Sequence, residues 1–126
     1  MPTELSPQSQ LPLSVPVHQI LLSMAETDRH GYAIIQDIRE RTDGEVDLTA
    51  STLYGALSRM LNHGMIVEVA GAQPETGGAP RRTYRITQYG RSVARAEADR
   101  LARALDQARS RGLGPEAQAT SREAGR

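Results

Sequence analysis

Apolar residues recur with the period of an α-helix in three segments of the first half of the chain. The pattern predicts helices over about residues 16–27 and 31–42, and a third helix that is capped by Thr49 or Ser51 and ends before Gly64. The side chains expected to face the core lie three or four residues apart within each helix: Val17, Ile20, Leu21, Met24, Ile34, Ile35, Ile38, Leu53, Leu57, Met60 and Leu61.

The pattern then changes to two short strand-like runs, over residues 65–70 and 83–86, with a Gly- and Pro-rich segment between them. Thr87 can cap a long final helix over about 88–111. The sequence therefore predicts a mainly α chain with a small β-hairpin (α+β), in the order of a winged helix-turn-helix followed by a long C-terminal helix.

The two ends of the chain differ in composition from the middle. Residues 1–14 hold three prolines among Ser and Gln, and residues 112–126 are rich in Gly, Ala, Glu and Arg. Neither end has a regular apolar pattern, so we expect a disordered arm and a disordered tail. The winged-helix domain is then expected over 15–87 and the long helix over 88–111.

The composition excludes several classes of protein. The chain has 126 residues and no Cys, which rules out disulfides, a thiolate nucleophile and a Cys-based metal site. Its apolar runs are too short to cross a membrane, and no leader-like segment opens it, so a soluble, cytoplasmic protein is expected. The three His have neither a partner nucleophile nor metal-ligand spacing, so we expect no enzyme activity, cofactor or metal.

The formal net charge is zero, but the charges are unevenly distributed along the chain. Residues 1–80 hold four Arg against ten carboxylates, and residues 81–126 hold eleven Arg against five. All the cations are Arg, which binds phosphate and guanine in a bidentate manner, although a general preference for Arg over Lys would produce the same count.

The outward face of the third helix is small or hydrogen-bonding and carries no carboxylate. This face consists of Ser51, Gly55, Ser58, Arg59 and Asn62. Small residues let a helix enter a major groove deeply, while Ser, Arg and Asn can reach base edges. The alternative interpretation is an ordinary solvated face.

The hairpin provides a second candidate for contact with nucleic acid. Its Gly-Gly-Ala-Pro tip precedes Arg81 and Arg82, which places cations beside a narrow loop able to approach a phosphate backbone. Strand alternation puts Arg82 and Tyr84 on the same face. A loop with solvated arginines is the alternative.

The last helix carries an apolar stripe with heptad spacing. The stripe consists of Ala94, Ala98, Leu101, Leu105 and Ala108. Because its alanines make it thin, it can hold two helices together only with additional surface, for which the first helix, with Val17 and Leu21, is the candidate.

These pieces together resemble the PadR-like family of transcriptional regulators. The resemblance is carried by HGYAII (30–35), STLYGALSRM (51–60), NHGMI (62–66) and GGAPRRTYRITQYG (77–90), which fall in the order and spacing of the family over about residues 17–108. It implies a dimeric winged-helix DNA-binding repressor of the short subgroup, in which a single last helix is used for dimerisation.

The resemblance also bears on individual residues. It places Tyr54 at the DNA-facing entry to the recognition helix, where its hydroxyl can reach a phosphate; the alternative is a ring that packs on the second helix. His30 fits the start of a helix and can also donate to a phosphate. Gly55 departs from the family, which commonly has Pro here. The chain has no Trp, so the binding of flat aromatic drugs between tryptophans is not carried over.

We therefore expect a sequence-specific transcriptional regulator that binds double-stranded DNA as a homodimer and acts as a repressor. The candidate DNA-binding residues are Thr49, Ser51, Thr52, Tyr54, Gly55, Ser58, Arg59, Arg81, Arg82, Tyr84 and His30. A small apolar effector ligand at the dimer interface is compatible with the sequence. The alternative function is a winged-helix protein–protein adaptor, which the zero net charge keeps open.

Overall fold

A computed structural model describes residues 5–70 and 82–116 of the chain. Its elements follow one another in the order η1 (Pro7–Gln10), α1 (Val15–Ser23), β1 (Arg29–His30), α2 (Gly31–Arg41), α3 (Ala50–Asn62), β2 (Ile66–Val69), β3 (Thr83–Ile86) and α4 (Gln88–Ser110). The predicted fold class, a winged helix-turn-helix followed by a long helix, is confirmed.

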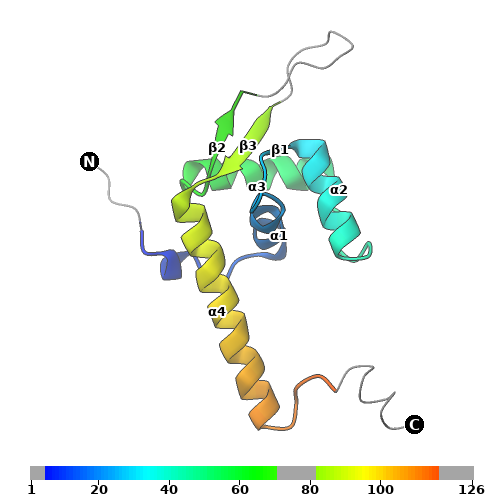
Figure 1. The fold of residues 1–126 in the computed structure, drawn as a ribbon, viewed down its shortest axis with the longest axis vertical. Coiled ribbons are helices and arrows are strands. Elements are labelled where there is room, and N and C mark those ends of the chain that lie inside the picture. The colour runs from blue at the N-terminus through cyan, green and yellow to red at the C-terminus, as the bar shows by residue number, and fades with distance from the viewer. Residues whose placement is uncertain (1–4, 71–81, 117–126) are drawn as a thin grey trace.

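The helices form one body with the sheet on top of it, and α4 leads away from that body (Figure 1). α1 lies against α2, α3 and α4. Its buried side chains join those of α2, α3, β2 and β3 in one core that includes Ile20, Ile34, Leu57, Ile66 and Tyr84. This core supports α3 from below and leaves its opposite face toward solvent.

The sheet has three antiparallel strands in the order β1-β3-β2. β2 pairs with β3 from Ile66 opposite Ile86 to Val69 opposite Thr83. The sequence did not predict β1, because a strand of two residues is too short to show alternation. By pairing with β3, it ties the start of α2 to the wing.

Hydroxyl side chains cap three of the helices, as the sequence predicted. Ser14 accepts the Val17 N–H at the start of α1, and Thr87 accepts the Gly90 N–H at 2.9 Å at the start of α4. Of the two candidates for α3, Thr49 is the cap. α1 ends at Ser23 and not at 27, because the backbone leaves the α-helical conformation at Met24; the carbonyl of Ser23 then accepts from Arg29.

The prediction of a disordered arm is wrong for residues 5–14. η1 packs along α4, and Leu11 and Leu13 are half-buried against the core. These leucines lack helical spacing, so periodicity gave no sign of their burial. At the other end, Gly112 has φ 75° just after α4, and residues 117–126 of the predicted tail lie outside the described residues.

Candidate nucleic-acid interface

The outer face of α3 presents hydroxyl, amide and guanidinium groups to solvent. α3 buries Leu53, Ala56, Leu57 and Met60 and contains neither Asp nor Glu. The exposed positions on the other side are Ser51, Thr52, Ser58, Arg59 and Asn62. Within α3 the one charged residue is Arg59. The structure thus brings the residues predicted for base contact onto one accessible face.

Gly55 is a position on this face that carries no side chain. A Cβ built at Gly55 would meet only the Nη1 atom of Arg59, at 3.7 Å, which is an ordinary contact distance. A guanidinium nitrogen of Arg59 therefore lies back along the helix, within contact distance of the position that a Cβ at Gly55 would take.

The start of α3 is held by a pair of threonines. Thr49 accepts the Thr52 N–H at 3.1 Å, and its hydroxyl donates to the Thr52 hydroxyl at 3.1 Å. Both side chains are exposed. The pair thus shapes the end of α3 that faces α2, and its oxygen atoms remain accessible.

Tyr54 packs on the N-terminus of α2 and still reaches solvent. Its side chain approaches Gly31 so closely that a Cβ there would collide with the Tyr54 hydroxyl group. Tyr54 nevertheless remains 47% exposed. The ring therefore packs on α2, which was one of the two interpretations from the sequence, and the residue also stays accessible to solvent.

His30 caps α2. Its Nδ1 atom accepts the Ala33 N–H at 3.2 Å, which satisfies one of the free backbone donors at the start of α2. His30, Gly31 and Tyr54 line a surface cavity of about 390 Å³ together with Tyr32 and Arg82. This cavity lies where α2, α3 and the wing meet.

Tyr32 was not among the residues predicted from the sequence. It is 61% exposed, because the helical period that buries Ile34 and Ile38 turns it outward. An exposed aromatic side chain directly after the glycine at a helix start was the available signal.

The prediction for the wing is partly wrong. Tyr84 is only 2% exposed, because β3 turns the face that carries Tyr84 and Ile86 toward the core. Burial raises the pKa of the Tyr84 hydroxyl, and a hydrogen bond from Arg82 opposes that shift. Arg82 is exposed, with its Nε atom 3.9 Å from a carboxylate oxygen of Glu68. Arg81 lies outside the described residues.

The opposite face of β3 carries Arg85, which ties the wing to the loop between α1 and β1. Its guanidinium donates to both carboxylate oxygens of Asp28, at 3.1 and 2.9 Å. This hydrogen bonding from Arg85 lowers the pKa of Asp28. The pair fixes the loop before β1 against the wing.

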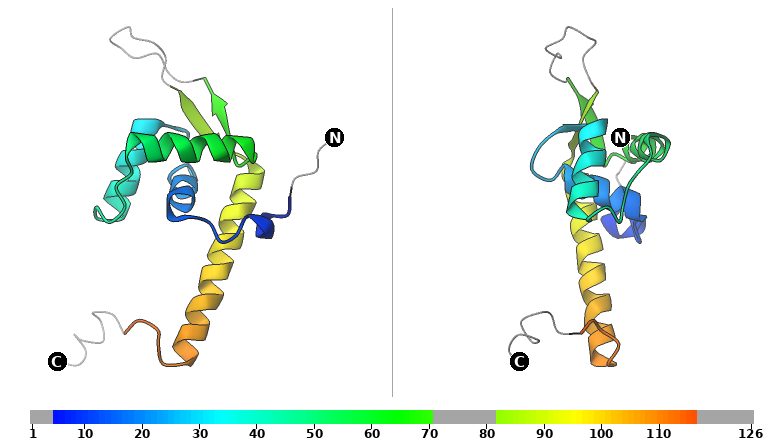
Figure 2. Two further views of the ribbon diagram at one scale, coloured as in Figure 1. Left: turned by 180° about the vertical axis from the view of Figure 1, so that it is seen from behind. Right: turned by 90° about the vertical axis from the view of Figure 1, so that its right-hand side faces the viewer.

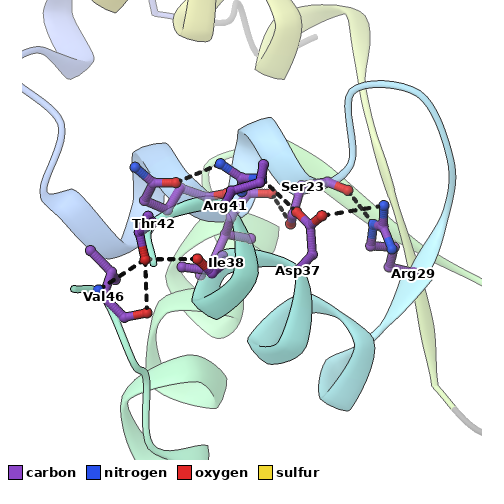
Figure 3. Close-up of polar contacts among 9 residues, drawn as sticks. Ser23, Arg29, Asp37, Ile38, Arg41, Thr42 and Val46 are labelled. Carbon is purple, nitrogen blue, oxygen red and sulfur yellow. Dashed lines mark hydrogen bonds and ion pairs between the residues drawn. The ribbon is translucent and has the colours of Figure 1, made fainter. Parts of the chain in front are cut away.

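A second ion-pair network joins α1 to α2 on the side shown in Figure 3. Asp37 accepts from Arg41 at 2.8 Å and lies 3.6 Å from a nitrogen of Arg29. Arg29 also donates to the Ser23 carbonyl, and Arg41 donates to the side chain and the carbonyl of Gln19. These two arginines thus orient α2 on α1 within the helix-turn-helix.

The stripe predicted for self-association is exposed along the outer half of α4. Ala98, Leu101 and Leu105 are exposed, whereas Ala94 is half-buried on the protein's own core and Ala108 is half-buried near the helix end. These positions leave Leu101 and Leu105 as the large apolar side chains of the stripe that are open to a second chain.

The predicted contribution of α1 to self-association is wrong. Leu21 is 0% exposed and Val17 is 9% exposed, because both fill the core of this chain. The exposed apolar side chains of α1 are Val15 and Leu22, seven residues apart on its outer side.

Within residues 5–70 and 82–116, no group of three His, Cys, Asp or Glu is arranged to hold a metal ion. No helix in the same part of the chain is both long and apolar enough to cross a membrane.

Comparison with known proteins finds a curated relative and solved structures of the same fold. An uncharacterized protein X of Lysinibacillus sphaericus is 34% identical over 73 residues, which cover 58% of this chain and 65% of that protein. This chain therefore spans just under two thirds of that relative. A PadR family transcription regulator of Clostridium difficile is 26% identical with a TM-score of 0.66, over 80% of this chain and 100% of that one.

The PadR protein of Bacillus subtilis, solved in complex with operator DNA, has the same fold. It is 21% identical with a TM-score of 0.58, over 71% of this chain and 48% of that one. The family model described as "Transcriptional regulator PadR-like family" matches residues 20–96, which is more than half of this chain. The chain therefore belongs to the PadR-like family of transcriptional regulators.

Proposed function

We propose that this protein binds double-stranded DNA in a sequence-specific manner, as a homodimer, and represses transcription by occupying its operator. The observation that carries the proposal is the outer face of α3, which is exposed, free of carboxylates and occupied by Ser51, Ser58, Arg59 and Asn62. The operator complex of Bacillus subtilis PadR, which has the same fold, supports the proposal.

In this proposal α3 enters the major groove. Arg59 is the base-reading residue, because a guanidinium can donate two hydrogen bonds to guanine. The open space at Gly55 lets the helix backbone approach the base edges closely. Ser58 and Asn62 lie on the same outer face of α3, and their shorter side chains can donate and accept hydrogen bonds.

The cavity between α2, α3 and the wing is assigned to the phosphate backbone. Tyr54 and Tyr32 can donate their hydroxyl hydrogens there, and Arg82 supplies a positive charge. The first turn of α2 adds backbone N–H groups and the positive end of the helix dipole. His30 lines the same cavity and keeps α2 capped.

The homodimer is proposed to form along α4. Every side chain from residue 101 to 110 is exposed except Ala108, which is half-buried. A helix of about ten residues without a packing partner is marginal in water, so this half of α4 requires one. A second copy supplies it most simply, since Leu101 and Leu105 can meet their equivalents across a two-fold axis. A small apolar effector ligand at this seam would change the relative position of the two copies.

The experiment that tests the proposal separates a DNA-binding regulator from a protein–protein adaptor. The full chain is titrated with duplexes selected from a random pool and with scrambled duplexes, at several salt concentrations. A DNA-binding regulator prefers the selected duplexes, and the logarithm of its binding constant falls linearly with the logarithm of the salt concentration. An adaptor binds both weakly at every salt concentration, and that result would overturn the proposal.

Two variants refine the titration. Arg82→Ala removes a proposed phosphate contact, so it should lower the slope of log affinity against log salt by about 0.9 on all duplexes. Arg95→Ala, at an exposed position of α4, is the matched control and should leave the slope unchanged.

A further inference from the structure

We infer that the N-terminal segment, residues 5–14, is a brace that fixes the angle at which α4 leaves the winged-helix body. In the homodimer of the proposed function, on which this step rests, the brace thereby sets the distance between the two DNA-binding surfaces. The segment lies outside residues 20–96, which the family model matches.

Polar contacts tie the brace to the first half of α4. Gln10 donates through its side-chain amide to the Tyr89 hydroxyl at 3.1 Å. The backbone N–H of Leu13 donates to a carboxylate oxygen of Glu97 at 3.4 Å. These contacts lie two turns apart on α4, and η1 lies beside that helix (Figure 2).

Apolar contacts hold the brace from the other side. Leu11 and Leu13 are half-buried against the core cluster. The segment is therefore held both by α4 and by the winged-helix core. A segment with this position resists a change in the angle between them.

Glu97 marks the point at which α4 leaves the body. The residue is only 3% exposed, yet its two oxygens accept from Arg100 at 2.9 and 2.8 Å, in addition to the Leu13 N–H. A buried carboxylate persists only where its hydrogen bonds are made, and here one of them comes from the brace. From residue 101 to 110 the helix runs through exposed positions, apart from the half-buried Ala108.

A small change in the angle at which α4 leaves the body produces a large displacement at the far end of the helix. From Glu97 to Ser110 the helix extends about 20 Å, so a tilt of about 10° moves its far end by roughly 3 Å. This displacement is about one base-pair step of DNA, ~3.4 Å. In a dimer joined near residues 101–108, a loosened angle would let the two recognition helices fit half-sites of several spacings.

The test uses the absence of Cys in the chain, since introduced cysteines are then the sole labelling sites. Spin labels are attached to Gln36→Cys on α2 and Gln107→Cys on α4, both exposed positions. The labelled protein is diluted with unlabelled protein, so that pulsed dipolar spectroscopy reports the distance within one copy. This measurement requires neither DNA nor a second copy.

The brace variant is Gln10→Ala with Leu11→Ser. Its matched control, Leu5→Ser with Gln8→Ala, makes similar changes at exposed positions of the same segment. The brace variant should broaden the distance distribution by about 3 Å, while the control leaves it unchanged. Gln10→Ala alone, which removes one hydrogen bond, is measured as well, so that a folded variant is available if the double variant loses helix content by circular dichroism.

The DNA arm compares affinity for paired half-sites whose spacing is increased or decreased by single base pairs. The native chain and the control should prefer one spacing, and the brace variants should bind several spacings about equally. If the brace variants keep the distance distribution of the native chain, or its preference for one half-site spacing, the proposal that residues 5–14 fix the angle of α4 is overturned. If the native chain binds no DNA, the proposed function fails, and the distance measurement still decides whether the segment braces α4.

Discussion

The double substitution Leu101→Ala with Leu105→Ala tests the proposed self-association most sharply. Full burial of a Leu side chain is worth about 1.5–3 kcal/mol. Leu101 is 42% exposed and Leu105 is 36% exposed, so burying the exposed part of each against a partner is worth roughly 1 kcal/mol.

A two-fold dimer contains four such leucines, which together contribute about 4 kcal/mol. Their loss should raise the dissociation constant of the dimer by roughly a thousandfold. Alanine favours helix, so the substitutions should not shorten α4 by themselves. Leu113→Ala is the matched control, because Leu113 follows α4 and is 81% exposed.

The assay is sedimentation velocity over a range of protein concentrations, with circular dichroism of the same samples. We expect the double variant to be monomeric at concentrations at which the native chain and the Leu113 variant are dimeric. An unchanged dimer would refute the assignment of these leucines to the seam, and a monomeric native chain would refute the proposed homodimer itself.

Two glycines and one carboxylate supply the remaining predictions. Gly55→Ala should raise the free energy of unfolding by about 0.5–1 kcal/mol, because its Cβ has room and alanine favours helix. Gly90→Ala should lower it by roughly 1–3 kcal/mol, since the Cβ would collide with the carbonyl oxygen of Met65; urea unfolding measures both, and equal effects would contradict the packing described. Hydrogen bonds from Arg100 lower the pKa of Glu97 against the opposing effect of burial. A carboxyl group with a lowered pKa stabilises the fold at pH values above its ordinary pKa of about 4.5, and this stabilisation is lost as the pH falls through the lowered pKa. On acidification, the free energy of unfolding of Glu97→Gln should therefore decrease less than that of the native chain. An equal acid slope in native chain and variant would contradict this prediction.

Local chemistry allowed most of the fold to be predicted from the sequence. The hydroxyls of Ser14, Thr49 and Thr87 each precede an apolar helical pattern, and each caps the helix that follows. The outward face of α3 was predictable for the same reason, because the positions opposite Leu53 and Leu57 must face away from the core.

Features that depend on tertiary contacts were not predictable from local pattern. Tyr84 was assigned to DNA because alternation defines two faces of a strand without showing which one is buried. Val17 and Leu21 were assigned both to the core and to a second chain, and in the structure both side chains are buried in the core. Leu11 and Leu13 belong to a segment whose order comes from α4, 80 or so residues away along the chain.

The central claim is that α3 reads DNA sequence through Arg59, and one titration tests it most directly. The native chain, Arg59→Ala and the control Arg95→Ala are each titrated with the selected operator and with its scrambled form at one salt concentration. Arg59→Ala should lose about 1–3 kcal/mol of affinity for the operator and much less for the scrambled duplex, so that the ratio of the two affinities falls. The control should keep the native ratio. An unchanged ratio for Arg59→Ala would contradict the account, because α3 would then not read the base sequence through this side chain.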